Sequence, residues 1–260
     1  MRIALDLSPA CGQWTGVGRY VRDLARGLVE SGLDPAGVYQ GHHGPPDDVD
    51  RWCQTRHRYD FIGGRIGLAL RLPGLLRRER IDLYHATTCI GAPGKGWRGR
   101  MVATIHDCFP LDPHLPTSAH DRRRFARLFA AVRTRARLII CPSTTAAAQI
   151  RTHGWDGPVH VIPHGLAPAA PASRPPQAPP VYLLSIGAIE PRKGLDRLAR
   201  SLGAESGRPP WFHLGPLRSD PDGAISAAMT AAGCHRLGLS LIHISEPTRL
   251  RRISYAVFCL

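Results

Sequence analysis

Two adjacent cations follow a short apolar run in LLSIGAIEPRKG, residues 183–194. Arg192 offers a planar guanidinium that matches two phosphate oxygens, and Lys193 offers a compact ammonium charge. Together they could hold a diphosphate and stabilise negative charge that grows on it as a bond breaks. The alternative is a solvated helix start, but cations at a helix N-terminus oppose its dipole by roughly 0.3–1 kcal/mol each. A bound anion would offset that cost.

A histidine and an aspartate end another apolar run, in IHDCFP at residues 105–110. Open α/β sheets bind ligands beyond the carboxyl ends of their strands. We expect His106 to contact a substrate hydroxyl or carbonyl there, and Asp107 to orient its ring. His85 and His164 occupy comparable positions. The residue pattern alone leaves open that each histidine is only a packing residue.

Two glycines follow the first apolar run, in TGVGRY at residues 15–20. Gly16 and Gly18 would let the backbone approach a ligand, and the amides of a helix that opens here would favour a phosphate. The third glycine of a dinucleotide fingerprint is missing. A structural loop with positive φ is the alternative interpretation.

These candidate sites depend on a larger pattern in which apolar runs alternate with amphipathic helical stretches, as is typical of parallel α/β sheets. Prolines crowd residues 168–180, which predicts an interdomain linker. We therefore predict a first α/β domain at 1–167 and a second at 181–238. The predicted strands are 2–7, 82–86, 101–106, 137–142 and 159–163 in the first domain, and 181–187 and 211–215 in the second.

The composition limits the classes of protein that the chain can be. It has 260 residues, 43% of them apolar, and a formal net charge of +14. Only Lys95 and Lys193 among its 34 Lys and Arg residues are lysines, a bias typical of GC-rich coding sequence, so the charge says little about a partner. No basic stripe interleaved with aromatic residues occurs, so we expect no nucleic-acid partner, although a basic nucleic-acid-binding protein is kept as an alternative class.

The seven cysteines form no C-x-x-C pair and no zinc-ligand spacing, which favours buried thiols over disulfides or a metal. The start of the chain, MRIALDLSPA, lacks a signal-peptide apolar region, and no stretch reaches the roughly 20 apolar residues of a membrane span. We therefore predict a cytoplasmic protein. The arginine-rich stretch 121–137 predicts an amphipathic helix whose solvated face also suits peripheral contact with an anionic inner membrane.

Five landmarks occur in order along the chain: GVGRY, TIHD, CPSTTAAAQI, VHVIPHG and SIGAIEPRKG. This order resembles the retaining glycosyltransferases of the GT4 family (glycosyl transferases group 1), over about residues 2–238. The resemblance implies the GT-B fold, in which two Rossmann-like domains with parallel sheets face each other across a cleft. It implies sugar transfer from a nucleotide-sugar donor to a glycan or lipid-linked acceptor, without an essential metal or other cofactor. The chain departs from the family at His164 and Gly194, where Asn is usual.

The resemblance assigns roles to the candidate residues. Gly16 and Gly18 would approach donor and acceptor. His106 and Asp107 would act at the transferred sugar, for which the resemblance suggests mannose. Glu190, Arg192 and Lys193 would bind the donor diphosphate or sugar. A GT-B-like sugar-nucleotide epimerase is the alternative enzyme, because it too needs cations for a diphosphate. The candidates are Gly16, Gly18, His106, Asp107, Glu190, Arg192 and Lys193.

The last 22 residues, LSLIHISEPTRLRRISYAVFCL at 239–260, have a different character. LSLIHISEPTR resembles the translation of a transposase sequencing adapter, so we predict a non-native tail, which is excluded from fold reasoning. The family resemblance calls for further β-α units after 238. We therefore expect a foldable first domain, a truncated second domain and little or no transferase activity in this polypeptide.

Overall fold

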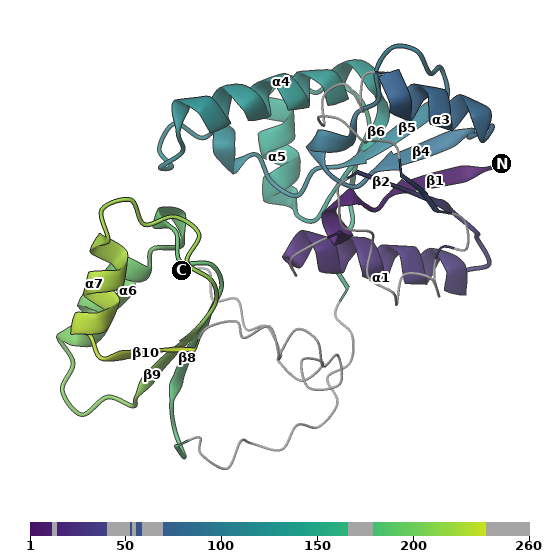
Figure 1. Ribbon diagram of the computed structural model, residues 1–260. Helices are drawn as coiled ribbons and strands as arrows, with labels where there is room; N and C mark the ends of the chain where they lie inside the picture. Colours follow the sequence, from purple (N-terminus) through teal and green to yellow (C-terminus); the bar gives the residue numbers. More distant parts are fainter. Residues whose placement is uncertain (12–14, 41–52, 54–55, 59–69, 166–178, 238–260) are drawn as a thin grey trace. The chain divides into compact units, whose positions relative to one another are not determined.

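The computed structural model describes residues 1–11, 15–40, 53, 56–58, 70–165 and 179–237. The chain divides into two compact units, Met1–Gly165 and Leu166–Leu260 (Figure 1). The described parts of both units are α/β with parallel strands, as predicted from the sequence. The predicted linker 168–180 and tail 239–260 lie outside the described residues, apart from 179 and 180.

The first unit is built on a seven-stranded sheet in the order β3-β2-β1-β4-β5-β6-β7, with every neighbouring pair parallel. Five strands correspond to predicted runs, whereas β2 and β3 were not predicted. β2 is interrupted by Gly37 and β3 is a polar edge strand, so neither stands out as an apolar run. The strands are β1 (Ile3–Asp6), β2 (Ala36–Tyr39), β3 (Arg56–Arg58), β4 (Leu83–Ala86), β5 (Arg100–Thr104), β6 (Ala136–Cys141) and β7 (Val159–Val161).

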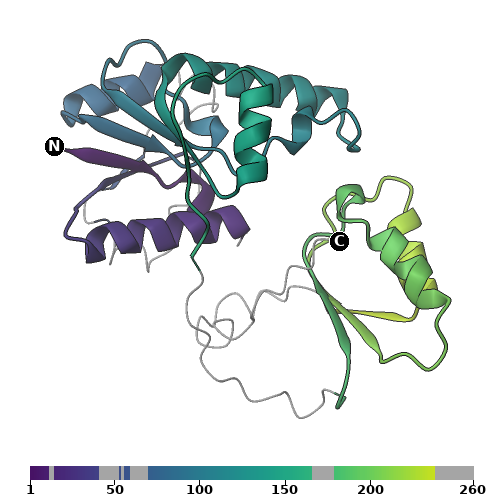
Figure 2. The ribbon, with the colours of Figure 1, turned by 180° about the vertical axis from the view of Figure 1, so that it is seen from behind.

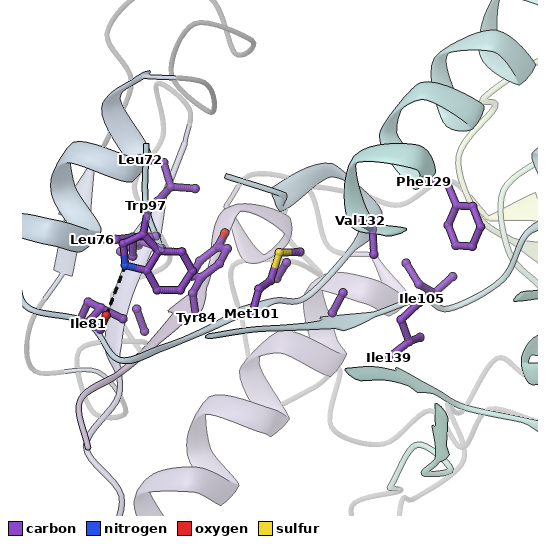
Figure 3. Packing of buried hydrophobic residues seen from close by; sticks show 14 of the residues in the cluster. Leu72, Leu76, Ile81, Tyr84, Trp97, Met101, Ile105, Phe129, Val132 and Ile139 are labelled. Carbon is purple, nitrogen blue, oxygen red and sulfur yellow. Dashed lines mark hydrogen bonds between the residues drawn. The ribbon is translucent and has the colours of Figure 1, made fainter. Parts of the chain in front are cut away.

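Helices cover both faces of this sheet (Figures 1 and 2). On one face, α1 buries Val21 and Ala25 against Leu5 and Leu7. The larger core lies on the other face, where Figure 3 shows Trp97, Tyr84 and Met101 packed in a row, with the Trp97 indole N–H donating to the Ile81 carbonyl at 3.3 Å. The helices are α1 (Gly16–Glu30), α3 (Leu72–Arg78), α4 (Ala119–Arg135) and α5 (Thr144–Thr152), with 3-10 turns η1 (Ser8–Ala10), η4 (Cys89–Gly91) and η5 (Phe109–Leu111).

The second unit has a three-stranded parallel sheet in the order β10-β9-β8. Its core joins Trp211 to Leu195 and Ala199 of one helix and Ile225 and Met229 of the next. The last strand was not predicted. The elements are β8 (Leu183–Ile186), η6 (Pro191–Lys193), α6 (Leu195–Gly203), β9 (Trp211–Leu214), α7 (Ala224–Ala231) and β10 (Cys234–Leu237).

The opposite face of this small sheet carries Leu184, Phe212 and His235 in register. The Phe212 ring stacks on His235 at 5.0 Å between centroids and meets Tyr182 edge-on at 5.8 Å. Leu184 is 46% exposed. Since α6 and α7 both pack into the core described above, neither covers this aromatic face.

Candidate active site

Polar side chains gather at the carboxyl edge of the first unit's sheet. His85, in β4, and Thr104, at the end of β5, are nearly inaccessible to solvent. The imidazole Nε2 of His85 lies 2.8 Å from the Thr104 hydroxyl, which lies 2.9 Å from the Tyr20 hydroxyl. A hydrogen-bonded chain therefore runs from the sheet to α1. The sequence did not point to Tyr20 or Thr104 as site residues, because these hydrogen-bond partners lie 84 positions apart in the chain.

His106 follows β5 and lies at this same edge. Its Nε2 is 3.0 Å from the backbone carbonyl oxygen of Thr87, and its Nδ1 is 3.3 Å from Nε2 of His164. The Tyr20 ring packs edge-on against His106 at 4.9 Å and also contacts His164 at 4.8 Å between ring centroids. The structure thus brings His106, His164 and Tyr20 into one cluster, which we call the histidine cluster, with His85 and Thr104 behind it.

Both ring nitrogens of His106 have partners other than Asp107. Asp107 itself is exposed. The expectation that Asp107 orients the His106 ring is therefore replaced by orientation through Thr87 and His164, since one ring has only two nitrogens. A catalytic role for Asp107 stays a prediction.

Burial keeps the histidines of this edge neutral at pH 7. It lowers the pKa of His85 to about 4, and the nearby His106 lowers it further. Burial likewise lowers the pKa of His106 to about 4, opposed by its bond to the Thr87 carbonyl and reinforced by His164. The pKa of His164 is also lowered by burial. Neutral imidazoles can donate and accept hydrogen bonds at the same time.

The two N-terminal glycines lie inside the first turn of α1, where Thr15 is the N-cap. The Thr15 hydroxyl accepts a hydrogen bond from the Gly18 amide at 3.0 Å, so this amide is already bonded within the chain. A Cβ on Gly18 would stand 2.7 Å from the Pro9 carbonyl oxygen, whereas one on Gly16 would meet nothing within 4 Å. Neither glycine has positive φ, so the alternative of a left-handed structural loop is wrong. Gly18 serves close packing, and Gly16 leaves open space.

Asp6 ends β1 at this edge and was not predicted to matter. It is 2% exposed, and one of its carboxylate oxygens accepts from the Ser8 amide at 3.0 Å and the Ser8 hydroxyl at 2.5 Å. Desolvation nevertheless raises its pKa to about 6, against the lowering effect of those bonds. A carboxyl with such a pKa changes charge near physiological pH.

The cations of the second unit lie in the loop that follows β8. Glu190 is buried, and its carboxylate oxygen Oε1 lies 2.6 Å from Nη2 of Arg192. The side chain of Lys193 is exposed. Arg197 adds a third cation, because its guanidinium lies 3.2 Å from the position that a Cβ on Gly194 would take. The predicted residues Glu190, Arg192 and Lys193 therefore lie in one loop, in which the Glu190 carboxylate forms an ion pair with Arg192.

The position of these cations relative to the helix differs from the sequence expectation. Arg192 and Lys193 belong to the 3-10 turn η6, and α6 begins only at Leu195, with Asp196 in its first turn. Gly194 makes the transition in the left-handed conformation, at φ +64°. The cost assigned to cations on a helix N-terminus is therefore smaller than expected, because they precede the helix and Arg192 is ion-paired.

The ends of β8 and β9 approach each other closely beside this loop. The Gly187 amide donates to the Leu214 carbonyl at 2.9 Å, and a Cβ on Gly215 would overlap the Gly187 carbonyl oxygen. Behind it, the Ser185 hydroxyl accepts from the Trp211 indole at 2.9 Å and lies 2.8 Å from Nδ1 of the buried His213. This internal network fixes the strand ends that carry the loop.

GT-B glycosyltransferases have two α/β units, each built on a sheet of parallel strands. The two units of this chain have such sheets, with polar or charged side chains at a strand-to-helix edge of each. Residues 14–169 match the family model described as Glycosyltransferase Family 4, and the chain belongs to that family. It is therefore an enzyme, a glycosyltransferase. No curated protein matches the chain.

Solved structures with the same fold are distant in sequence. HepE of Anabaena, in complex with UDP-glucose, superposes with a TM-score of 0.66 at 15% identity, over 92% of this chain and 69% of that one. The lipopolysaccharide outer core galactosyltransferase WaaB, in its apo form, gives 0.59 at 12% identity, over 97% and 72%. A Listeria monocytogenes protein described as a UDP-N-acetylglucosamine 2-epimerase gives 0.52 at 9% identity, over 91% and 68%. At these identities the likeness concerns the fold.

Proposed function

We propose that this glycosyltransferase moves a sugar, with retention of anomeric configuration, from a nucleoside-diphosphate sugar to a glycan or lipid-linked acceptor. Arg192 and Lys193 bind the donor diphosphate in this proposal. The observation that carries it is the placement of these cations in one turn after β8, with Arg192 oriented by the buried Glu190. Ligands of open α/β sheets bind at such strand ends.

The chemistry explains why paired cations would serve the reaction. When the glycosidic bond to the donor breaks, negative charge grows on the departing diphosphate. Preorganised cations stabilise that charge more in the transition state than in the ground state, which accelerates the step. We therefore propose that the cations take the place of a metal. Binding of a nucleoside diphosphate that persists in EDTA would support this, and binding that is lost in EDTA and restored by Mg²⁺ would contradict it.

We propose that residues of the first unit contact the transferred sugar. His106 would contact the transferred sugar, with Asp107 beside it, and the open space at Gly16 would admit donor or acceptor. Because both ring nitrogens of His106 are already bonded within the chain, we propose that His106 contacts the sugar through its ring face and carbon-bound hydrogens. The related structure of HepE holds UDP-glucose, whereas the family resemblance of this chain suggests a mannosyl donor, so UDP-glucose and GDP-mannose are the two donors to test.

The decisive experiment is calorimetric titration of the chain with UDP and with GDP. Lys193→Ala should weaken binding of the preferred diphosphate about tenfold or more, and Arg192→Ala with Lys193→Ala should abolish it, since each charge-assisted hydrogen bond contributes roughly 1.5–3 kcal/mol. Arg200→Ala is the matched control, because this arginine is also ion-paired, with Asp196 at 2.8 Å, but lies in the last turn of α6 and outside η6. Undiminished affinity in the double variant would reject the assignment.

A sugar-nucleotide epimerase is the second candidate, favoured by the fold shared with the Listeria protein. Both enzymes bind a nucleotide sugar, but only the transferase needs an acceptor. Conversion of the nucleotide sugar to its epimer without acceptor would favour the epimerase. Transfer that depends on an added glycan or lipid-linked acceptor would favour the transferase.

We further propose a cytoplasmic protein that touches the inner membrane peripherally through α4, which exposes Arg123, Arg124 and Arg127. No helix in the described ranges is long and apolar enough to cross a bilayer. Salt-sensitive sedimentation with vesicles of anionic lipid would support the contact. Equal sedimentation with neutral vesicles would contradict it, and salt-sensitive binding of nonspecific DNA would revive the nucleic-acid alternative.

A further inference from the structure

When His106 is neutral, the hydrogen bonds around its ring allow only one arrangement of protons. The Thr87 carbonyl oxygen, 3.0 Å from Nε2 of His106, can only accept, so Nε2 must carry the hydrogen. A neutral imidazole then has a lone pair at Nδ1. The atom 3.3 Å from this Nδ1 is Nε2 of His164, which must therefore donate. The geometry assigns the Nε2–H tautomer to both rings.

The His164 ring is also packed in place. Its centroid lies 4.8 Å from that of Tyr20 and 5.2 Å from that of His106. Tyr20 is itself bonded through its hydroxyl to Thr104, which ties the pair to the sheet. His164 is exposed as a residue. Its ring is thus held against Tyr20 and bonded to His106 at the surface of the first unit.

We propose that His164 is a positioning residue: its Nε2–H, donated to Nδ1 of His106, fixes the tautomer and the orientation of the His106 ring against the Thr87 carbonyl. The residue that orients the sugar-side histidine is thereby 58 positions further along the chain and not the neighbouring Asp107.

One functional consequence rests on the proposed function, in which His106 contacts the donor sugar. With both nitrogens already bonded, His106 can contact a sugar through its carbon-bound hydrogens and ring face without losing either bond. It can donate to a sugar hydroxyl only by releasing Thr87. The neutral His106 ring, held by both hydrogen bonds, would therefore contribute its shape and a fixed dipole to sugar binding.

The test is nitrogen-15 and proton NMR of the imidazole rings in the full chain, with His106→Gln to assign the signals. His164→Phe keeps an aromatic ring beside Tyr20 but has no N–H, whereas His164→Gln keeps an N–H donor near the position of Nε2. In His164→Phe, the Nδ1 signal of His106 should move to that of a free lone pair, and the pKa of His106 should rise by roughly one unit because the neutral form loses a bond. His164→Gln should resemble the wild type.

Other titratable groups face the His106 ring and must be followed in the same experiment. They are His85 behind it, Tyr20 at its edge and Asp107 next in the chain. The signals of His85 should stay unchanged in both variants, since its bond to Thr104 is intact. Thermal unfolding monitored by circular dichroism checks that all variants fold.

The outcomes separate this inference from the proposed function. Unchanged His106 signals in His164→Phe, or the same change in His164→Gln, would overturn the positioning role. Titration with UDP-glucose and GDP-mannose, compared with UDP and GDP, then asks whether the sugar itself shifts the carbon-bound hydrogens of His106. A positioning effect with no sugar-dependent shift would leave His164 as the orienting residue and reject His106 as a sugar contact.

Discussion

At the scale of single residues, Asp6 is a buried acid with a raised pKa. It lies at the end of β1, beside the loops that carry the candidate site. Gly91 approaches it so closely that a Cβ there would stand 2.5 Å from the carboxylate. A residue that destabilises the fold when charged, yet lies at the strand edge of the candidate site, is a candidate for function.

The stability effect of Asp6 has a definite sign. Its folded pKa of about 6 exceeds the usual 3.8, so the folded state binds the proton more tightly. The stability that this proton adds is fully present below pH 3.8 and is lost as pH rises through 6. Asp6→Asn removes the charge and keeps an oxygen acceptor for Ser8. It should therefore raise the free energy of unfolding by up to about 3 kcal/mol at pH 8 and by less at pH 5.

Urea unfolding at the two pH values measures this difference. Asp6→Leu is the control, because it removes the charge and also the acceptor for the Ser8 amide and hydroxyl, so it should gain less. An equal gain for Asp6→Asn at both pH values would show that the carboxyl titrates normally in the folded chain.

At the scale of elements, the start of α1 separates two glycines that look alike in the sequence. Gly18→Ala would place a methyl group 2.7 Å from the Pro9 carbonyl oxygen. The helix would have to shift from η1, at a cost of about 1–3 kcal/mol. Gly16→Ala has open space and gains helix propensity, so it should stabilise the chain by up to about 1 kcal/mol.

The pair of variants also tests ligand approach. If a nucleotide sugar comes close to the backbone at Gly16, Gly16→Ala should weaken its binding although the protein is more stable. Calorimetry and thermal unfolding of the same two samples give both quantities. Unchanged affinity together with higher stability would restrict Gly16 to a structural role.

At the scale of the whole molecule, the neutral histidines make the first unit sensitive to acid. The folded pKa values of His85 and His106, about 4, lie below the usual 6.5, so the unfolded chain binds protons first as pH falls. Their contribution is fully present above pH 6.5 and is lost as pH falls towards 4. Asp6 acts in the opposite direction between pH 6 and 3.8, but one carboxyl does not outweigh two imidazoles.

We therefore expect the first unit to lose about 2–4 kcal/mol of stability between pH 7 and pH 4.5. Urea unfolding of the full chain with Trp211→Phe follows this unit, because Trp97 and Trp155 report on its core. His85→Gln combined with His106→Gln should flatten the pH dependence. A dependence as steep as in the unsubstituted chain would assign the acid sensitivity to other groups.

Local patterns in the sequence determined much of this protein. Five strands of the first unit, two of the second, and the turn with Arg192 and Lys193 after a strand of the second unit were all predicted. Each depends on residues a few positions apart, where apolar period, glycine and proline act directly on the backbone. The strands β2, β3 and β10 were missed, because β3 and β10 are largely polar and β2 is interrupted by Gly37, so none of them stands out as an apolar run.

Tertiary structure alone decided the partners of the candidate residues. His106 faces Thr87 and His164, which lie 19 and 58 positions away, and not the adjacent Asp107. The neutral state of these rings and the raised pKa of Asp6 arise from burial, which no local pattern reports. The sequence determines that the imidazoles, the Asp6 carboxyl and the cations of the candidate site are present. Which of them meet, and in which protonation state, depends on distances between strand ends that only the packed sheet sets.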